Sequence, residues 1–139
     1  MSGPSFFNLT LANQIHKESL KNFTKQLAAK KNHLVDAQQK YQKSLEIVDE
    51  IQHYLADKSK HLTDLQEKLE KYQDKTEQKE LHHQIESLEH FIKKYTAKLG
   101  HYIERIEQLT PKISTLEDQV TELERVNEVR KNNPVAPRA

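Results

Sequence analysis

The feature that most constrains this chain is an apolar or aromatic residue at every seventh position between Leu20 and Leu69. With Leu20 at position a of a heptad, most d positions are also apolar, so a seam repeats about every 3.5 residues. The a positions hold Leu20, Leu27, Leu34, Tyr41, Val48, Leu55, Leu62 and Leu69, and the d positions hold Phe23, Lys30, Ala37, Ser44, Ile51, Lys58, Leu65 and Tyr72. Only a helix that packs along another helix can use such a seam, so the pattern predicts a long helix over about 20–72.

A second seam of the same kind follows the wholly polar residues 73–80. Its a positions hold Ile85, Ile92, Leu99, Ile106, Ile113 and Val120, and its d positions hold Leu81, Leu88, Tyr95, Tyr102, Leu109, Leu116 and Leu123. Leu81 comes nine positions after Tyr72, and nine residues rotate a helical stripe by roughly half a turn. A single straight helix would therefore carry the two seams on opposite sides, so the pattern predicts a reversal of direction and a second helix over about 79–131.

The predicted antiparallel hairpin has a definite register. When facing residues have numbers that add up to 150, a positions meet d positions along both seams, as in Leu65 with Ile85. On the outer edge, the same register brings Lys31 opposite Glu117. A parallel homodimer is the alternative topology, because β-branched residues at a, Leu at d and Asn127 at a are typical of parallel two-stranded coiled coils.

The predicted organisation is all-α, with a hairpin that associates into a larger bundle. Residues 1–19 form an N-terminal overhang with an apolar docking segment, residues 20–131 form the coiled-coil hairpin with a turn over about 73–78, and residues 132–139 form a disordered tail.

Two local signals refine the second helix. Asp74 and Glu77 have the spacing of a capping box, which satisfies the first N–H groups of a helix. Pro111 falls on the outer face, where its missing N–H predicts a kink near residue 111 rather than an end to the helix.

The composition narrows the classes of function. The chain has 139 residues, of which 35% are hydrophobic and 31% charged, which is too polar for a thick globular core and suits long helices. A net charge of +1 with interspersed signs provides no basic field for nucleic acid. No cysteine is present, so thiol chemistry is excluded. Neither a signal peptide nor a membrane span is visible in the sequence, so we expect a cytoplasmic location.

The eight histidines call for a test of metal binding. Glu50 with His53, and Glu80 with His83, have the Glu-x-x-His spacing of di-iron bundles, but these residues fall at c and f positions that face water. His82, Glu86 and His90 are spaced by four, a spacing that arises often by chance in a histidine-rich helix. No nucleophile with its base and no glycine-rich phosphate loop occurs, so we expect no metal, no cofactor and no enzyme.

A wide apolar band near the middle of the hairpin predicts contact with another chain. Besides the seam, apolar residues occupy e and g positions there, which is more than two helices can cover. The residues of this band are Leu45, Ile47, Tyr54, Phe91 and Ile103.

The second predicted contact surface is the N-terminal overhang, whose residues have no partner within the hairpin register. Its apolar residues are Phe6, Phe7, Leu9, Leu11 and Ile15. Clustered apolar side chains without an internal partner mark contact surfaces, although a frayed terminus is the simpler alternative. The alternation of Phe7, Leu9 and Leu11 also leaves a short extended segment open.

These patterns together predict a non-enzymatic coiled-coil interaction protein, acting as a scaffold, an adaptor or a small structural subunit of a protein assembly. Its partners would be proteins bound through helix packing, in a homo- or hetero-oligomer, with no nucleic acid and no membrane insertion. The alternatives are a parallel coiled-coil homodimer, or an export adaptor that holds a client protein.

Overall fold

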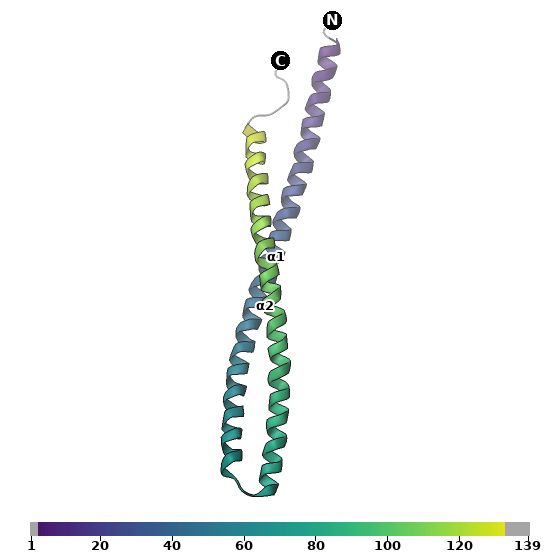
Figure 1. Cartoon of the computed structure of the whole chain (residues 1–139). Coiled ribbons are helices and arrows are strands. Elements are labelled where there is room, and N and C mark those ends of the chain that lie inside the picture. Colours follow the sequence, from purple (N-terminus) through teal and green to yellow (C-terminus); the bar gives the residue numbers. More distant parts are fainter. Residues whose placement is uncertain (1–2, 133–139) are drawn as a thin grey trace. The chain divides into compact units, whose positions relative to one another are not determined.

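The fold consists of two long α-helices, α1 (Gly3–Lys71) and α2 (Lys75–Asn132), joined by a three-residue link (Figure 1). The structure, a computed structural model, describes the backbone of residues 3–132 and the side chains of residue 14 and residues 17–132. No strand occurs among residues 3–132. The all-α fold and the antiparallel hairpin that the two seams predict are confirmed.

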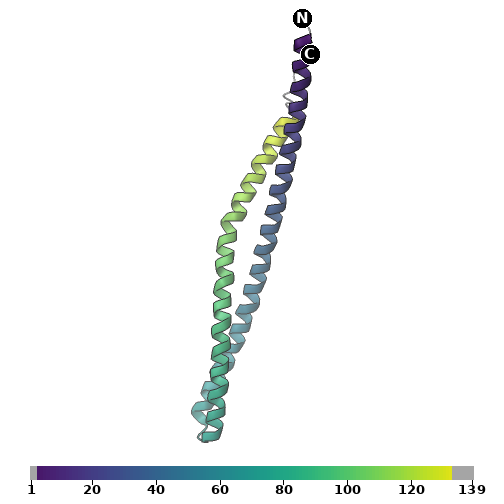
Figure 2. The same cartoon turned by 90° about the vertical axis from the view of Figure 1, so that its right-hand side faces the viewer.

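The chain divides into two compact units, each of which contains part of α1 and part of α2. Unit 1 comprises Met1–Gln39 and Thr110–Ala139, and unit 2 comprises Lys40–Leu109. In unit 2 the link between the helices makes the two helical segments antiparallel, and they lie side by side in both views (Figure 1, Figure 2).

The core of unit 2 follows the predicted register. Leu65, Ile85 and Leu88 are buried together, and Leu62 and Leu69 are among the half-buried residues that pack against them. With Leu81, which also packs there, they form the pairs Leu65 with Ile85, Leu62 with Leu88 and Leu69 with Leu81, whose numbers add up to 150. Because every one of these residues is at a or d, the seam of one helix is filled by the seam of the other, as knobs-into-holes packing requires.

The core of unit 1 has the same construction. Leu27 and Ala37 of α1 are buried, as are Leu116 and Val120 of α2. All four occupy a or d positions, so the seams of the two helices also meet within unit 1.

Polar residues on the seam are accommodated in two ways. Lys30 and Lys58 at d positions are half-buried, which is the burial expected when an apolar stem packs and the ammonium group reaches water. Ser44 is only 2% exposed, and its Oγ donates to the Lys40 carbonyl at 2.7 Å. The hydroxyl is thereby satisfied within its own helix, at a position where the register places the larger Ile106 opposite.

The end of α1 corrects one prediction about the seam. Tyr72 was expected to pack at a d position, but it is 46% exposed because α1 ends at Lys71. Its backbone is used instead: the Tyr72 carbonyl accepts a hydrogen bond from Gln78 Nε2 at 2.6 Å. The seam therefore stops at Leu69.

The start of α2 uses half of the predicted capping box. Asp74 Oδ1 accepts the Thr76 backbone N–H at 3.0 Å, and the Asp74 carbonyl accepts the Gln78 N–H at 2.9 Å. Asp74 is thus the N-cap, and α2 begins at Lys75, inside the stretch expected to be the turn.

Both helices extend beyond their expected limits. α1 begins at Gly3 rather than near residue 20, so the backbone of the expected overhang is helical. This excludes the short extended segment that alternation had left open. α2 runs through Pro111 without ending, as expected, and reaches Asn132. The predicted tail, residues 132–139, lies outside the described residues from 133 onward.

Candidate functional site

The predicted apolar band lies on two different sides of unit 2. In an antiparallel pair, g positions of one helix lie beside g positions of the other, and e positions lie beside e positions. The g flank is the surface of unit 2 formed by the g positions and the adjoining c positions of both helices. The e flank is the surface formed by the e positions and the adjoining b positions. Ile47, Tyr54 and Phe91 are at g, whereas Leu45 and Ile103 are at e. The heptad positions of these residues predict this division.

Aromatic rings dominate the g flank. The rings of Tyr54 and Tyr95 are 4.5 Å apart between centroids and tilted by 47°, which joins α1 to α2 across the flank. Lys58 Nζ lies 5.2 Å from the Tyr54 centroid, within the range of a cation–π contact. Phe91 remains 47% exposed, so a large apolar ring on this flank has no complete cover within the chain.

A groove of about 480 Å³ runs beside these rings. It is lined by Tyr54, Lys58, His61, Leu65, His83, Gln84, Ser87, Leu88 and Phe91. The core residues Leu65 and Leu88 contribute to its wall, while His61 and His83 are exposed. The groove therefore offers an apolar interior with polar margins, which is the composition of a protein contact site.

The g flank continues to the turn as a second, more polar groove of about 260 Å³. Lys68 and Tyr72 of α1 and Glu77, Glu80, Leu81 and Gln84 of α2 line it. Apolar groups occupy the middle of the flank, and opposite charges occupy its turn end.

The e flank has fewer large apolar side chains than the g flank. Leu45 is 37% exposed and Ile103 is 39% exposed, and the register places them opposite each other. No groove described for unit 2 is lined by either residue. Of the five residues in the predicted band, Tyr54 and Phe91 line the groove, whereas Ile47 is half-buried outside its lining and Leu45 and Ile103 lie on the other flank.

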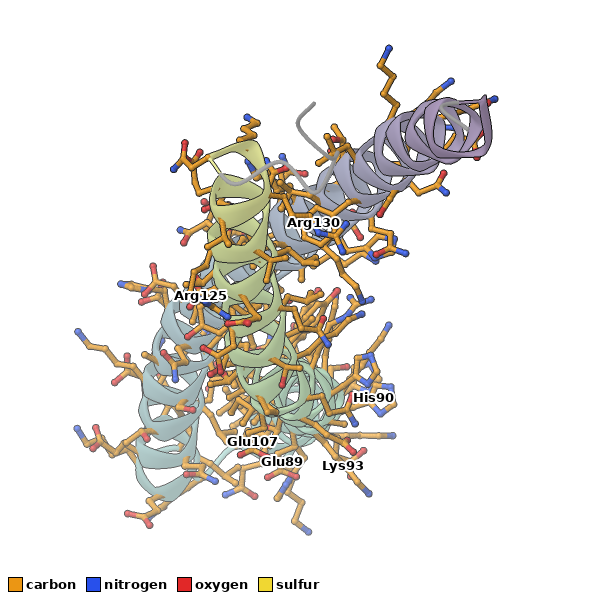
Figure 3. All side chains as sticks on the ribbon, turned by 90° about the horizontal axis from the view of Figure 1, so that it is seen from above. Glu89, His90, Lys93, Glu107, Arg125 and Arg130 are labelled. Carbon is orange, nitrogen blue, oxygen red and sulfur yellow. The ribbon has the colours of Figure 1, made fainter. Side chains whose placement is uncertain are left out.

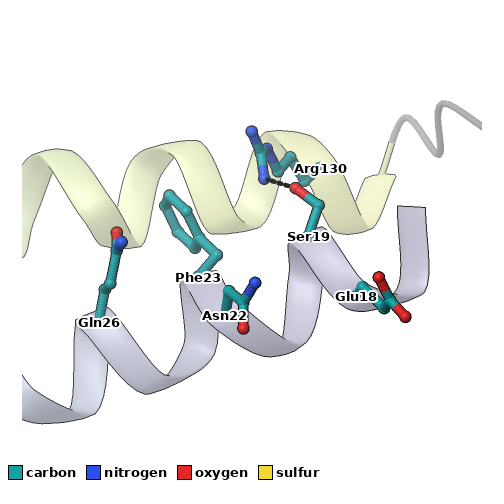
Figure 4. A pocket seen from close by; sticks show the side chains of 6 residues that line it. All are labelled: Glu18, Ser19, Asn22, Phe23, Gln26 and Arg130. Carbon is teal, nitrogen blue, oxygen red and sulfur yellow. Dashed lines mark hydrogen bonds between the residues drawn. The ribbon is translucent and has the colours of Figure 1, made fainter. Parts of the chain in front are cut away.

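Unit 1 contains a contact between the helices that sequence analysis missed. Arg130 Nη1 of α2 donates to Ser19 Oγ of α1 at 2.8 Å, and the guanidinium carbon lies 5.0 Å from the Phe23 centroid (Figure 4). With Glu18, Asn22 and Gln26 these residues line a groove of about 420 Å³. The register places Arg130 opposite Leu20, next to Ser19, but it does not predict which side chains the guanidinium contacts.

A further ion pair in unit 1 differs from its prediction by one heptad. Lys31 was expected opposite Glu117, but its Nζ lies 3.0 Å from Glu124 Oε1. Both glutamates are at e positions of α2, one heptad apart, and a long lysine side chain reaches either of them. The register determines which glutamates lie near Lys31, and the geometry of the lysine side chain determines which of them it pairs with.

The predicted N-terminal docking residues, Phe6, Phe7, Leu9, Leu11 and Ile15, lie outside the described side chains. Only the helical backbone of this segment is described. Their role as a contact surface stays a prediction.

The histidines examined as metal ligands are on the outer surface, as their heptad positions predict. His53, His82, His83 and His90 are all exposed, and His90 projects outward from α2 beside Lys93 (Figure 3). Within the described residues, no group of three or more His, Asp or Glu residues could hold a metal ion.

Two local interactions shift ionisation on the surface. His53 Nδ1 lies 2.8 Å from the Asp49 carbonyl and 3.6 Å from its carboxylate, and these contacts raise the pKa of His53 above 6.5. The Arg125 guanidinium, whose Nη2 donates to Glu122 Oε1 at 2.6 Å, lowers the pKa of Glu122. Both pairs lie within one helix, so they do not join α1 to α2.

No family model, no curated protein and no solved structure matches this chain. Within the described residues, neither helix contains a stretch apolar enough to cross a membrane. Any functional assignment therefore rests on the surfaces described above.

Proposed function

We propose that this protein is a non-enzymatic interaction protein, a scaffold, adaptor or small structural subunit, that binds other helical proteins through the g flank of unit 2. The observation that carries the proposal is the exposed Phe91 ring beside an apolar groove, on a helix pair whose seam is already filled. Fully burying an exposed side chain such as Phe contributes about 1.5–3 kcal/mol, so a partner helix that covers the 47% of Phe91 still exposed would gain about half of that. Helix packing on an existing pair is also how bundles of four helices form.

Site-specific photo-crosslinking tests this proposal. A photo-reactive phenylalanine analogue replaces Phe91 in one variant of the full chain and Lys93, which is exposed at a b position of the same helix, in a matched control. After irradiation in the native source, we expect a discrete crosslinked protein with the probe at position 91 and none at 93. Equal labelling from both positions would contradict a dedicated contact surface on the g flank. A client-holding export adaptor would instead give many crosslinked species from position 91.

The N-terminal part of α1 is the second contact surface that we propose. In the observed register the last described residue of α2, Asn132, lies opposite residue 18, so residues 3–16 of α1 extend past the described part of α2. Deleting residues 1–15 should then abolish partner binding and barely lower the melting temperature. Full binding by the truncated chain would show that this segment is not a contact surface.

A further inference from the structure

The g flank of unit 2 carries a charge pattern that is complementary to itself. This pattern identifies an occupant, and the inference rests on the proposed function of the flank as a contact surface. The register gives the position of each residue along the hairpin axis. A residue of α2 lies at the same level as the α1 residue whose number, added to its own, gives 150. Phe91 is then at the level of Ser59, and Tyr54 lies about one and a half turns away along the same groove.

In the middle of the flank, apart from Lys58 in the groove, the charges of α1 are acidic and those of α2 are basic. Glu50 and Asp57 occupy c positions on the outer edge of α1, and both are exposed. At the matching levels α2 carries Lys94 and Lys98, which are also exposed. Lys98 Nζ lies 5.7 Å from the Tyr95 ring, which places this cation on the flank.

Near the turn, the signs are exchanged between the helices. Lys68 and Lys71 are on α1, and Glu77 and Glu80 are on α2 at the levels of residues 73 and 70. Lys68, Glu77 and Glu80 line the groove at this end, so these charges border the same flank.

Two symmetric arrangements would bring two g flanks together, and the charges discriminate between them. With both turns at the same end, α1 of one copy lies opposite α2 of the other, so Asp57 meets Lys94 and Lys68 meets Glu80. With the turns at opposite ends, α1 lies opposite α1, and Glu50 meets Asp57 while Lys94 meets Lys98. The first arrangement opposes unlike charges and the second opposes like charges, which disfavours wrong pairings.

We propose that a second copy of this chain occupies the g flank, in a two-fold dimer of unit 2 whose turns lie at the same end. Phe91 and Tyr54 of each copy lie in the groove of the other, and Asp57 of each copy pairs with Lys94 of its partner. Every contact occurs twice, as two-fold symmetry requires. Farther from the turn, Lys43 of one copy would lie near Arg105 of the other, and both are positively charged. The pairing of opposite charges between the copies is therefore confined to residues 50–98.

Sedimentation equilibrium of the purified full chain at low salt tests this dimer. The unmodified protein should sediment as a dimer, and Phe91→Glu should sediment as a monomer with an unchanged helical signal in circular dichroism. Leu45→Glu is the matched control on the e flank and should remain dimeric. A monomeric unmodified chain, or a dimeric Phe91→Glu variant, would overturn the proposal.

Charge reversal tests the orientation. Asp57→Lys and Lys94→Asp should each weaken the dimer by about tenfold, because each places like charges together twice, and the double variant should recover most of that loss. Lys93→Asp, on the adjacent b position, should change the dissociation constant by less than about twofold. If the double variant is no tighter than the single variants, the arrangement with both turns at the same end is wrong.

The proposed function and the dimer can fail separately. If the unmodified chain is monomeric but a probe at position 91 crosslinks a different protein, the flank binds another partner and the dimer is wrong. If neither a dimer nor a specific crosslink forms, both are wrong. A crosslinked species of twice the chain mass, with the expected charge-reversal pattern, supports both.

Discussion

Units 1 and 2 are built from the same two helices and the same a and d seam, but they differ in what surrounds the seam. In unit 1, polar contacts join the helices at the edges: Arg130 bonds Ser19 and Lys31 pairs with Glu124. In unit 2, the Tyr54 and Tyr95 rings make the corresponding contact, and Phe91 remains exposed beside a groove. The comparison teaches that the seam determines how the helices pair, whereas the flanks determine which apolar groups remain exposed beside it.

The exposed apolar residues of unit 1 support this distinction. Val35 and Val129 are exposed, but they occupy b and c positions and line neither of the two unit 1 grooves, which have volumes of about 420 and 540 Å³. Scattered apolar residues are normal on protein surfaces. Phe91 of unit 2 differs because it is exposed and lines a groove together with Tyr54.

The largest expected effect on stability comes from replacing a core leucine with alanine. The loss in the free energy of unfolding should be similar in the two units. Leu65→Ala in unit 2 and Leu116→Ala in unit 1 should each lower the free energy of unfolding by about 2–5 kcal/mol, because each leaves a cavity in a buried seam. Urea denaturation followed by circular dichroism measures both. A loss below about 1 kcal/mol at one position only would break the comparison, since it would mean that the two seams are not equally packed.

The next effect concerns the small residues of the seam. Ser44 in unit 2 and Ala37 in unit 1 are both 2% exposed. Enlarging either one to Leu should lower the free energy of unfolding by about 1–3 kcal/mol through overpacking. Ser44→Ala should change it by less than about 0.5 kcal/mol, because the hydroxyl bonds only to a carbonyl of its own helix. A large loss for Ser44→Ala would show that the hydroxyl has a role beyond its size.

A smaller effect is expected at the Arg130 contact, which is specific to unit 1. Arg130→Ala should lower the free energy of unfolding by about 1–2 kcal/mol, since it removes a charged hydrogen bond and a cation over the Phe23 ring. Arg125→Ala is the matched control, because Arg125 pairs only with Glu122 on its own exposed helix face. Equal losses in a denaturation series would contradict a role for Arg130 in joining the helices.

The smallest effect is a pH dependence in unit 2. The raised pKa of His53 means that its contribution to stability is present below pH 6.5 and is lost as the pH rises through the raised pKa. Titration of the imidazole by NMR should give a value above 6.5, and Asp49→Ala should lower it because the carboxylate is removed. A value at or below 6.5 in the unmodified chain would exclude the interaction with Asp49.

The helix pairing could be predicted from the sequence because it depends on a repeated pattern. The sixteen a and d positions of the first seam all follow the same heptad repeat. A single polar residue among them, such as Lys30, therefore does not change the register. Single contacts depend on side-chain geometry and were less predictable. Lys31 selects Glu124 rather than Glu117, and Tyr72 leaves the seam because the helix ends one residue earlier.

The candidate site could be predicted only in part. Apolar residues at e and g positions indicated a surplus that two helices do not cover, and Phe91 is indeed exposed. The grouping of Tyr54 and Phe91 around one groove depends on the relation between two helices, which a list of residues does not contain. The Arg130 contact likewise combines residues that are far apart in the sequence.

The most direct test of the account is the distance between spin labels at exposed positions 28 and 121, which lie opposite each other in unit 1. Labelled chains are diluted with unlabelled chains, so that the electron–electron measurement reports distances within one chain. Helices packed about 8–10 Å apart predict a short distance between the labels. A chain that continues as one straight helix would separate them by about 140 Å at about 1.5 Å per residue. A short distance supports the antiparallel pair from which both flanks follow, and a long one contradicts it.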